Sequence, residues 1–250
     1  MGWPADVPAS AHLFVATAAD LADAMEVDGE DGHHLARVLR LRAGETVTVA
    51  DGSGTWRPYL IATAAGAAVH LEAAGPFQRE PVPTPLLAVA FALTKGDKPD
   101  LVVQKLTELG VDRIVPVLGE RSVSRPGPDR AGAAVERWRR IAREAARQCR
   151  RATLPVIEDL GPLAVLSGHP GLVVAERGGL PAVALGTPPG DEILVVVGPE
   201  GGLADPEVEA LKPWARLNLG PHILRAETAA LTAAALLATR RFGADGESPT

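Results

Sequence analysis

The segments ILVVVGPEGGL (Ile193–Leu203) and LNLGPHILRAETAALTAAA (Leu217–Ala235) decide the fold class of this chain. Each is a buried-strand pattern that ends at a glycine and leads into the start of a helix. In open α/β sheets, ligands bind in the crevice beyond the ends of such strands. The two turns therefore predict one pocket at a single sheet edge, where glycines admit a close approach of backbone and charged side chains gather: Gly198, Gly201, Gly202, Gly220, Glu200, Arg225 and Glu227.

The first glycine turn differs from the common phosphate-binding loops. The chain has no GxxxxGK[ST] sequence, and GPEGG (Gly198–Gly202) lacks the GxGxxG spacing. Glu200 would repel a pyrophosphate but suits a cationic or hydrogen-bond-donating ligand such as a sulfonium, an adenine or a ribose. Taken alone, GPEGG is equally consistent with a plain tight turn, and Arg225 with Glu227 is consistent with an internal ion pair.

Length and composition limit the class of protein to which this chain can belong. The chain has 250 residues, of which 46% are hydrophobic, so it can form one large domain or two smaller ones. Apolar runs such as Leu86–Leu93 are too short to span a bilayer, and MGWPADVPAS lacks the features of a signal peptide. The single cysteine, Cys149, excludes an internal disulfide framework. We expect a cytoplasmic protein without membrane contact, and no metal site, because the adjacent His33 and His34 lack partner ligands nearby in the sequence.

Positive charge is concentrated in two places, although the formal net charge is −6. Residues 136–151 contain seven arginines and two glutamates, a local net charge of about +5. Their spacing predicts a helix that buries one face and exposes arginines, which bind phosphates bidentately. RNA is therefore an expected partner, with a merely solvated helix as the alternative. A second basic cluster contains Arg37, Arg40 and Arg42.

The alternation of elements predicts two domains. After a short helix from His33 to about Leu39, the segments Thr46–Ala50, Trp56–Ala62 and Ala67–Glu72 read as antiparallel strands of a small β-barrel-like unit. The proline-rich stretch that follows predicts an extended linker without ladder pairing. Beyond it, βαβ alternation predicts a mostly parallel sheet. The predicted limits are 1–75, linker 76–85, α/β domain 86–243 and a disordered tail 244–250.

Four motifs also carry a family resemblance: ALTKGDKPDLVVQKLTELGVDRIVPVLGERSV (Ala92–Val123), REAARQCRRATLPVI (Arg143–Ile157), VVVGPEGGL (Val195–Leu203) and LGPHILRAETAALTA (Leu219–Ala233). In this order they resemble the motifs of the bacterial 16S rRNA uridine-N3 methyltransferase family, in the SPOUT superfamily. HHLARVLRLRAGETVTVADGSG (His33–Gly54) is similar to the PUA-like RNA-binding domain of that family.

The resemblance implies a SPOUT-type trefoil-knot α/β domain preceded by a small PUA-like β-barrel domain. It implies a homodimer that uses S-adenosylmethionine to methylate N3 of one uridine in the 16S rRNA of the small ribosomal subunit. The implied cofactor contacts are Gly198, Pro199, Glu200, Gly201, Gly202, Leu219, Gly220, Ile223, Leu224 and Arg225. The expected RNA contacts are His34, Arg37, Arg40, Arg42, Arg121, Arg147, Arg150 and Arg151.

Two positions depart from the family pattern, His222 after LGP and Arg150 after Gln148-Cys149. For catalysis we expect Glu227 as the base that takes the uracil N3 proton and Arg225 as the stabiliser of charge on O2 or O4, with His222 as a further candidate. Cys149 is expected to serve packing. Two alternatives stay open: a SPOUT enzyme acting on a ribose 2′-hydroxyl or on tRNA, and an RNA-binding assembly factor without catalysis.

Overall fold

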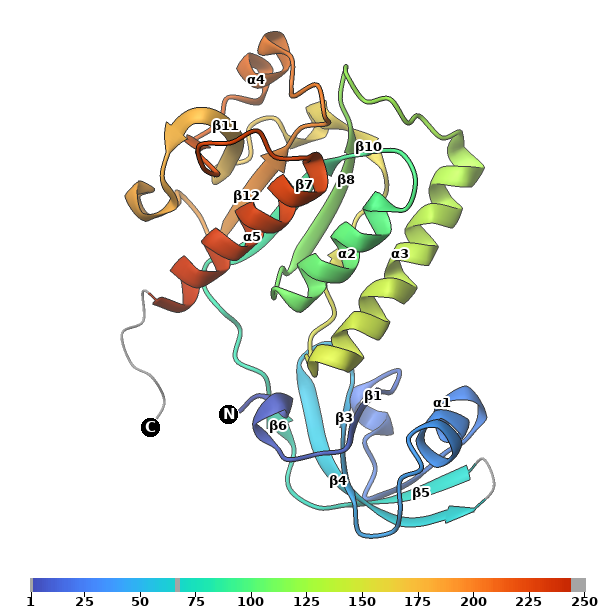
Figure 1. The fold of residues 1–250 in the computed structure, drawn as a ribbon. Helices are drawn as coiled ribbons and strands as arrows, with labels where there is room; N and C mark the ends of the chain where they lie inside the picture. Colours follow the sequence, from blue (N-terminus) through green and yellow to red (C-terminus); the bar gives the residue numbers. More distant parts are fainter. Residues whose placement is uncertain (1, 66–67, 244–250) are drawn as a thin grey trace. The chain divides into compact units, whose positions relative to one another are not determined.

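The computed structural model describes residues 2–65 and 68–243. Ala67, the first residue of the expected strand Ala67–Glu72, and the tail expected at 244–250 lie outside the described residues. The chain divides into two compact units (Figure 1). Unit 1 contains the residues up to Pro81 together with Arg143–Leu154, and unit 2 contains Val82–Ala142 with the residues from Pro155 onward. The 22-residue helix α3 (Pro128–Cys149) thus contributes to both units.

Unit 1 is built on a mixed β-sheet. Its strands pair in the order β1-β3-β4-β5-β2, with β6 beside β4; the β1/β3 pair is parallel and the others are antiparallel. A core that includes Leu35, Val47, Tyr59 and Leu71 forms on one face. The elements are η1 (Pro4–Asp6), β1 (Ala11–Phe14), η2 (Ala18–Asp20), β2 (Ala24–Val27), α1 (Gly29–His33), η3 (His34–Val38), β3 (Thr46–Ala50), β4 (Thr55–Ala65), β5 (Ala68–Ala73) and β6 (Gln78–Arg79).

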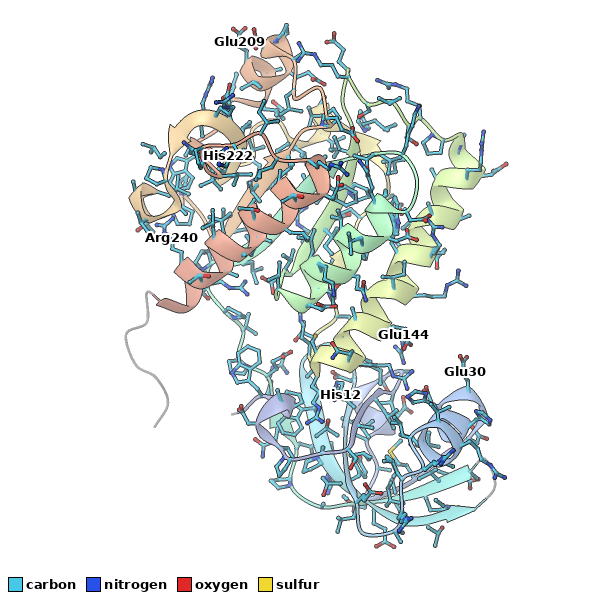
Figure 2. The ribbon with its side chains drawn as sticks, in the orientation of Figure 1. His12, Glu30, Glu144, Glu209, His222 and Arg240 are labelled. Carbon is cyan, nitrogen blue, oxygen red and sulfur yellow. The ribbon has the colours of Figure 1, made fainter. Side chains whose placement is uncertain are left out.

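The segment 143–154 is tied into unit 1 by buried polar contacts. His12 (labelled in Figure 2) is 4% exposed; its Nδ1 lies 2.8 Å from Thr48 Oγ1 and its Nε2 2.9 Å from the Arg151 carbonyl oxygen. Burial lowers the pKa of His12 to about 4, so the ring is neutral at physiological pH. The Arg143 guanidinium lies over the Phe14 ring, 5.1 Å from its centroid, and donates to the Phe14 carbonyl. This part of the arginine-rich segment therefore has a packing role.

The proline-rich stretch corrects one expectation. It was expected to make no ladder pairs, yet Gln78 and Arg79 form β6 against Trp56 and Thr55 of β4. The Glu80 amide extends the pairing by donating to the Gly54 carbonyl at 2.8 Å. The pairing is possible because the prolines fall outside these three residues, so that every amide it needs is present.

Unit 2 is an α/β structure with a parallel sheet. Its strand order is β10-β8-β7-β12-β11-β13, with β9 beside β8, and all these pairs are parallel. Besides the first part of α3, the elements are β7 (Leu86–Ala92), α2 (Lys98–Glu108), β8 (Arg113–Leu118), β9 (Val156–Ile157), β10 (Gly161–Pro162), η4 (Leu163–Leu166), β11 (Leu172–Leu180), η5 (Ala182–Ala184), β12 (Glu192–Val197), α4 (Asp205–Leu211), β13 (Ala215–Leu217) and α5 (Ala226–Gly243).

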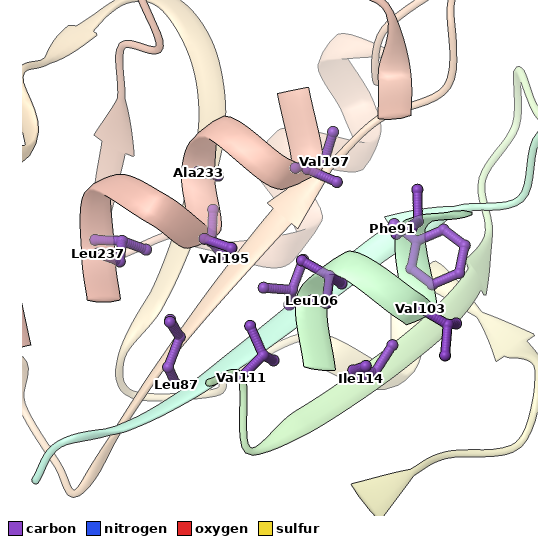
Figure 3. Packing of buried hydrophobic residues seen from close by; sticks show 14 of the residues in the cluster. Leu87, Phe91, Val103, Leu106, Val111, Ile114, Val195, Val197, Ala233 and Leu237 are labelled. Carbon is purple, nitrogen blue, oxygen red and sulfur yellow. The ribbon is translucent and has the colours of Figure 1, made fainter. Parts of the chain in front are cut away.

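The strands of unit 2 bury both faces, as their continuous apolar runs predict. Residues such as Leu87, Val195 and Val197 pack with α2 and α5 on one face (Figure 3). The alternate residues, such as Ala88 and Val196, pack with α4 and η4 on the other face. This sandwich fixes the strand ends, from which the candidate site is built.

Candidate functional site

A pocket of about 350 Å³ lies at the carboxyl ends of three neighbouring strands, β12, β11 and β13. This is the sheet edge at which α/β proteins bind ligands, and the volume falls in the usual range of about 300–1,000 Å³ for small-molecule sites. The pocket belongs entirely to unit 2. Its lining is Val174, Ala175, Glu176, Arg177, Val197, Gly198, Pro199, Glu200, Gly202, Leu203, Asp205, Val208, Asn218, Leu219, Gly220, His222, Ile223, Leu224, Ala226 and Ala229.

The two segments predicted to share a pocket do meet here. Of the ten residues expected to contact a cofactor, eight line it: Gly198, Pro199, Glu200, Gly202, Leu219, Gly220, Ile223 and Leu224. Gly201 and Arg225 do not. The Gly201 carbonyl instead accepts a hydrogen bond from Arg121 Nη1 at 2.8 Å, and the Arg225 side chain is exposed while its carbonyl accepts from the Ala229 amide in the first turn of α5.

The first loop, Gly198–Leu203, requires glycine for steric reasons. A Cβ on Gly198 would lie 2.9 Å from the Leu203 amide nitrogen and 3.0 Å from the Gly202 carbonyl carbon. Gly202 has φ +69°, in the left-handed region. Arg121 braces this loop from outside by donating to the carbonyls of Gly201 and Leu203. Arg121 was expected to face RNA; it is exposed, but this guanidinium nitrogen is bonded to the loop.

The second loop follows β13 and is shaped by Asn218. The Asn218 amide donates to the Leu180 carbonyl at 2.9 Å, which joins the loop to the end of β11. The Asn218 Oδ1 atom accepts from the Gly220 amide at 2.8 Å, and Gly220 has φ +129°, which only glycine adopts readily. His222 is exposed on this loop (Figure 2) and lines the pocket. His222, one of the two departures from the family pattern, therefore lies at the pocket.

A cluster of one ammonium and two carboxylates joins the first loop to the start of α5. Lys98 Nζ lies 3.1 Å from Glu200 Oε1 and 3.4 Å from Glu227 Oε2. The 3.4 Å pair lacks hydrogen-bond geometry, and Glu227 Oε2 is buried without a hydrogen-bond partner. A hydrogen bond from its own amide, followed by that from Lys98, lowers the pKa of Glu200, while the bond to Glu200 raises the pKa of Lys98. Glu200 and Lys98 are therefore both ionised at neutral pH.

The residues expected to bind RNA in unit 1 divide into two groups. Arg147 is 16% exposed and pairs with Asp31 at 2.8 Å, and Arg150 donates to the carbonyls of Val7 and Ala9. The Arg151 carbonyl accepts from His12. By contrast, Arg37, Arg40 and Arg42 are exposed, and His34 is half-buried.

The donor set of the pocket favours an organic ligand with apolar and cationic parts. Apolar side chains such as Val174, Leu203 and Leu219 form walls, while the carboxylates of Glu176, Glu200 and Asp205 supply negative charge. Within residues 2–65 and 68–243, no group of three or more histidine, cysteine or acidic side chains is placed to hold a metal ion. No described helix combines the length and apolar content needed to cross a membrane.

Comparison with known proteins accounts for both units. A family model of RNA methyltransferase domains matches residues 80–238, and a model of RNA methyltransferase PUA domains matches residues 27–70. The chain belongs to the RNA methyltransferase family. The first match contains the whole pocket, and the second contains the basic cluster at Arg37–Arg42.

Curated relatives carry a more specific name. The proteins called ribosomal RNA small subunit methyltransferase E from Mycobacterium bovis and Bacillus subtilis are each 31% identical to this chain. The matches cover 88% of this chain and 88% of the M. bovis protein, and 85% of this chain and 88% of the B. subtilis protein.

Solved structures agree with the fold. The ribosomal RNA small subunit methyltransferase E of Neisseria gonorrhoeae, bound to S-adenosyl methionine, is 26% identical, with a TM-score of 0.78 over 92% of this chain and 97% of that chain. A methyltransferase from Legionella pneumophila in complex with the same cofactor is 26% identical, with a TM-score of 0.77 over 94% of this chain and 98% of that chain. The predicted fold class, a PUA-like unit followed by a SPOUT-type α/β domain, is confirmed.

Sequence reasoning missed three contributors to the site. Lys98 was not predicted as a site residue, although its position at the start of α2, just after β7, places it at the sheet edge that carries the pocket. Asn218 follows β13 directly, and an asparagine two residues before a glycine is a turn signal. Glu176 lies in β11, which could have been placed beside β12 by the same rule for parallel strands.

Proposed function

We propose that this chain transfers the methyl group of S-adenosylmethionine to N3 of one uridine in the 16S rRNA of the small ribosomal subunit. The observation that carries the proposal is the pocket formed by Gly198–Leu203 and residues 218–224, at the strand ends of a chain that belongs to the RNA methyltransferase family. Relatives that are 31% identical are named for methylation of small-subunit rRNA.

The residues of the pocket fit this cofactor. An adenine can pack between the apolar side chains of Leu203, Leu219 and Leu224. The carboxylates at the rim favour a positively charged ligand, whereas P-loop sites favour a negatively charged phosphate. Gly220 has nothing within 4 Å of a would-be Cβ, so its backbone faces open space along the pocket wall. When bound, S-adenosylmethionine supplies an electrophilic methyl group on a sulfonium.

In the proposed mechanism, Glu227 holds the proton that leaves uracil N3. Its side chain is 13% exposed and adjoins the pocket without lining it, and its Oε2 atom is buried without a hydrogen bond, so this oxygen can accept a proton once the substrate reaches it. The ammonium group of Lys98, 3.4 Å away, holds the carboxylate in place. Because methyl transfer is an in-line displacement, the main task of the pocket is to hold the acceptor nitrogen in near-attack geometry.

Arg225 and His222 have secondary places in this mechanism. Arg225 stands exposed two residues before Glu227, so its guanidinium is free to swing toward O2 or O4 of the uracil and stabilise the developing anion. His222 lines the pocket and is a further candidate for the same contact. The target uridine has to leave its stack to reach such a site, which is least costly in a single-stranded or loop region.

The proposal includes a homodimer that works in the cytoplasm, where small subunits are available. Two large apolar side chains of unit 2, Val183 and Ile223, are 91% and 83% exposed, which is unusual for a surface without a partner. Ile223 also lines the pocket, so a second copy that covered it would complete the site. Sedimentation of the purified chain tests this part: a single species with the mass of one chain would contradict it.

The function is tested by incubating the chain with radiolabelled S-adenosylmethionine and three acceptors: small subunits from cells that lack this methylation, fully methylated small subunits, and bulk tRNA. Label in the first acceptor alone supports the proposal. Label in tRNA would favour the alternative SPOUT activity. Cofactor binding without transfer to any acceptor would favour a non-catalytic assembly factor.

The role of Glu227 is tested by Glu227→Gln. The amide keeps the shape but accepts no proton, so we expect kcat to fall by roughly 10²-fold or more while the Kd for S-adenosylmethionine changes little. Glu209→Gln, on an exposed position of α4, is the matched control. Unchanged turnover in Glu227→Gln would remove this residue from proton transfer.

A further inference from the structure

An exposed apolar pair stands among arginines in unit 1. Val38 and Leu39, at the end of η3, are 59% and 41% exposed. Arg37, Arg40 and Arg42 beside them are also exposed. We call residues 37–42 the basic tip.

The backbone holds this apolar pair away from the core. In an α-helix, Leu35, Val38 and Leu39 would share one face, so the sequence pattern would bury them together. Here η3 is a π-helical turn: the Leu39 amide donates to the His34 carbonyl five residues back, at 2.9 Å. Leu35 is 0% exposed and Leu41 9% exposed, so the tip is anchored on both sides while Val38 and Leu39 project outward.

Arg40 completes this turn in an uncommon conformation. Its φ is +56°, in the left-handed region that non-glycine residues seldom adopt. π-helical turns and left-handed non-glycine residues both occur preferentially at functional sites. Two such features within the seven residues His34–Arg40 therefore indicate a surface shaped for contact, not an accident of packing.

The three arginines of the basic tip are uncommitted within the described part of the chain. None of their guanidinium groups makes a hydrogen bond or ion pair there, whereas four other arginines of unit 1 (Arg57, Arg143, Arg147 and Arg150) all do. The nearby carboxylate of Glu45 forms no ion pair with them; it accepts hydrogen bonds from the Ser10 hydroxyl and the Arg42 amide. The tip thus presents positive charge around an apolar centre.

We propose that the basic tip binds RNA at an unpaired base, with Val38 and Leu39 packed against the face of the base and the three arginines on the flanking phosphates. The inference rests on the proposed function for the identity of the partner as RNA. Phosphate contacts alone would explain the arginines but would leave two apolar side chains in water. Apolar side chains that enter between bases or cover an unstacked base are a recurrent way of recognising distorted or looped nucleic acid.

The test compares two synthetic RNAs, a hairpin with 2-aminopurine in its loop and a blunt duplex of the same length, using the full chain. We expect Val38→Ser with Leu39→Ser to weaken hairpin binding about tenfold, to reduce the rise in 2-aminopurine fluorescence, and to leave duplex binding unchanged. The matched control is Leu60→Ser with Val156→Ser, because these side chains are 42% and 56% exposed on other elements.

Salt dependence separates the two kinds of contact. Replacing Arg37, Arg40 and Arg42 by glutamine should reduce the slope of log Kd against log salt by about 2, since each single-strand phosphate contact contributes roughly 0.7. The Val38/Leu39 double variant should keep the wild-type slope. Thermal unfolding of both variants should match the wild type, because all five side chains are exposed.

Three outcomes would overturn the inference: equal hairpin affinity of the Val38/Leu39 variant and the wild type, equal losses on hairpin and duplex, or a change in the sedimentation of the free chain, which would make the pair a protein contact. A failure of the proposed function looks different. In that case the wild type would transfer no methyl group to small subunits, while the hairpin effects persisted.

Discussion

At the scale of single residues, Lys98 has the most consequential contacts of the site. Its ammonium group bridges Glu200, on the pocket rim, and Glu227, the candidate proton acceptor. No short-range sequence pattern distinguishes Lys98 from the nearby Lys95. The role of Lys98 depends on contacts that α2 makes with the first loop and with α5, which lie far away in the sequence. Lys98 is a positioning residue in the proposed mechanism.

Lys98→Met should lower kcat about tenfold and leave the KM for RNA nearly unchanged, because the carboxylate of Glu227 loses its fixed partner. Lys98 also lowers the pKa of Glu200, so protonation of Glu200 should weaken S-adenosylmethionine binding at a higher pH in the variant than in the wild type. Lys98→Arg should restore most of the rate. Lys105→Met, which removes a lysine paired with Glu108 on the same helix, is the control; identical profiles for Lys98→Met and the wild type would contradict the assignment.

His12 predicts a pH dependence of stability. Its folded pKa is about 4, below the unfolded value of about 6.5, so the unfolded chain binds the proton more readily between these values. The contribution of His12 to the free energy of unfolding should therefore be complete above pH 6.5. It should fall by roughly 3 kcal/mol as the pH is lowered toward 4.

Urea unfolding at pH 5 and pH 7.5 measures this effect. His12→Gln should flatten the difference between the two pH values, whereas the exposed His70→Gln should not. The same pH dependence in His12→Gln and the wild type would show that another group is responsible.

At the scale of elements, the loop Gly198–Leu203 is the part of the site with the least steric freedom. Gly198→Ala would bring a Cβ within 2.9 Å of the Leu203 amide nitrogen, so the loop has to shift. We expect the Kd for S-adenosylmethionine, measured by calorimetry, to rise at least tenfold. The control is Gly132→Ala in α3, where a Cβ meets nothing within 4 Å; cofactor binding by Gly198→Ala at wild-type strength would separate this loop from the cofactor site.

The end of α5 is fastened to the loop after α2 by a buried ion pair. Arg241 has a side chain that is 3% exposed; it pairs with Asp112 at 2.5 Å and donates to the Gly110 carbonyl at 2.9 Å. Arg241→Ala should lower the free energy of unfolding by about 3 kcal/mol, because the carboxylate of Asp112, whose side chain is 16% exposed, loses its charged partner. Arg139→Ala, at a surface pair, should cost less than about 1 kcal/mol. Equal effects in urea unfolding would contradict the structural role of the buried pair.

The elements of unit 2 were largely predictable, for a physical reason. Strands buried on both faces are continuous apolar runs, so Leu86–Ala92 and Glu192–Val197 stand out in the sequence, and Gly110 marks the end of α2 with φ +79°. Short strands were not predicted in either unit, because two to four residues are too few to show a period in hydrophobicity. These strands are Ala11–Phe14 and Ala24–Val27 in unit 1 and Gly161–Pro162 in unit 2. The pocket was predictable because parallel strand ends share one sheet edge.

At the scale of the whole molecule, non-local contacts limited the prediction. The grouping of Arg143–Leu154 with the N-terminal residues depends on contacts such as His12 with Arg151, which are far apart in the sequence. Arg147 and Arg150, which were expected to bind RNA, are also engaged within unit 1, by Asp31 and by the carbonyls of Val7 and Ala9. Within the described residues, the exposed guanidinium groups of the basic tip make no such contact.

The proposed methylation of uridine N3 in small-subunit rRNA can be tested directly by identifying the methylated nucleoside. Small subunits from cells lacking this methylation are incubated with the chain and S-adenosylmethionine, and their rRNA is digested to nucleosides for chromatography and mass spectrometry. We expect 3-methyluridine, formed to at most one per 16S rRNA and roughly 10²-fold more slowly with Glu227→Gln. A ribose-methylated nucleoside or a methyl group on another base would contradict it.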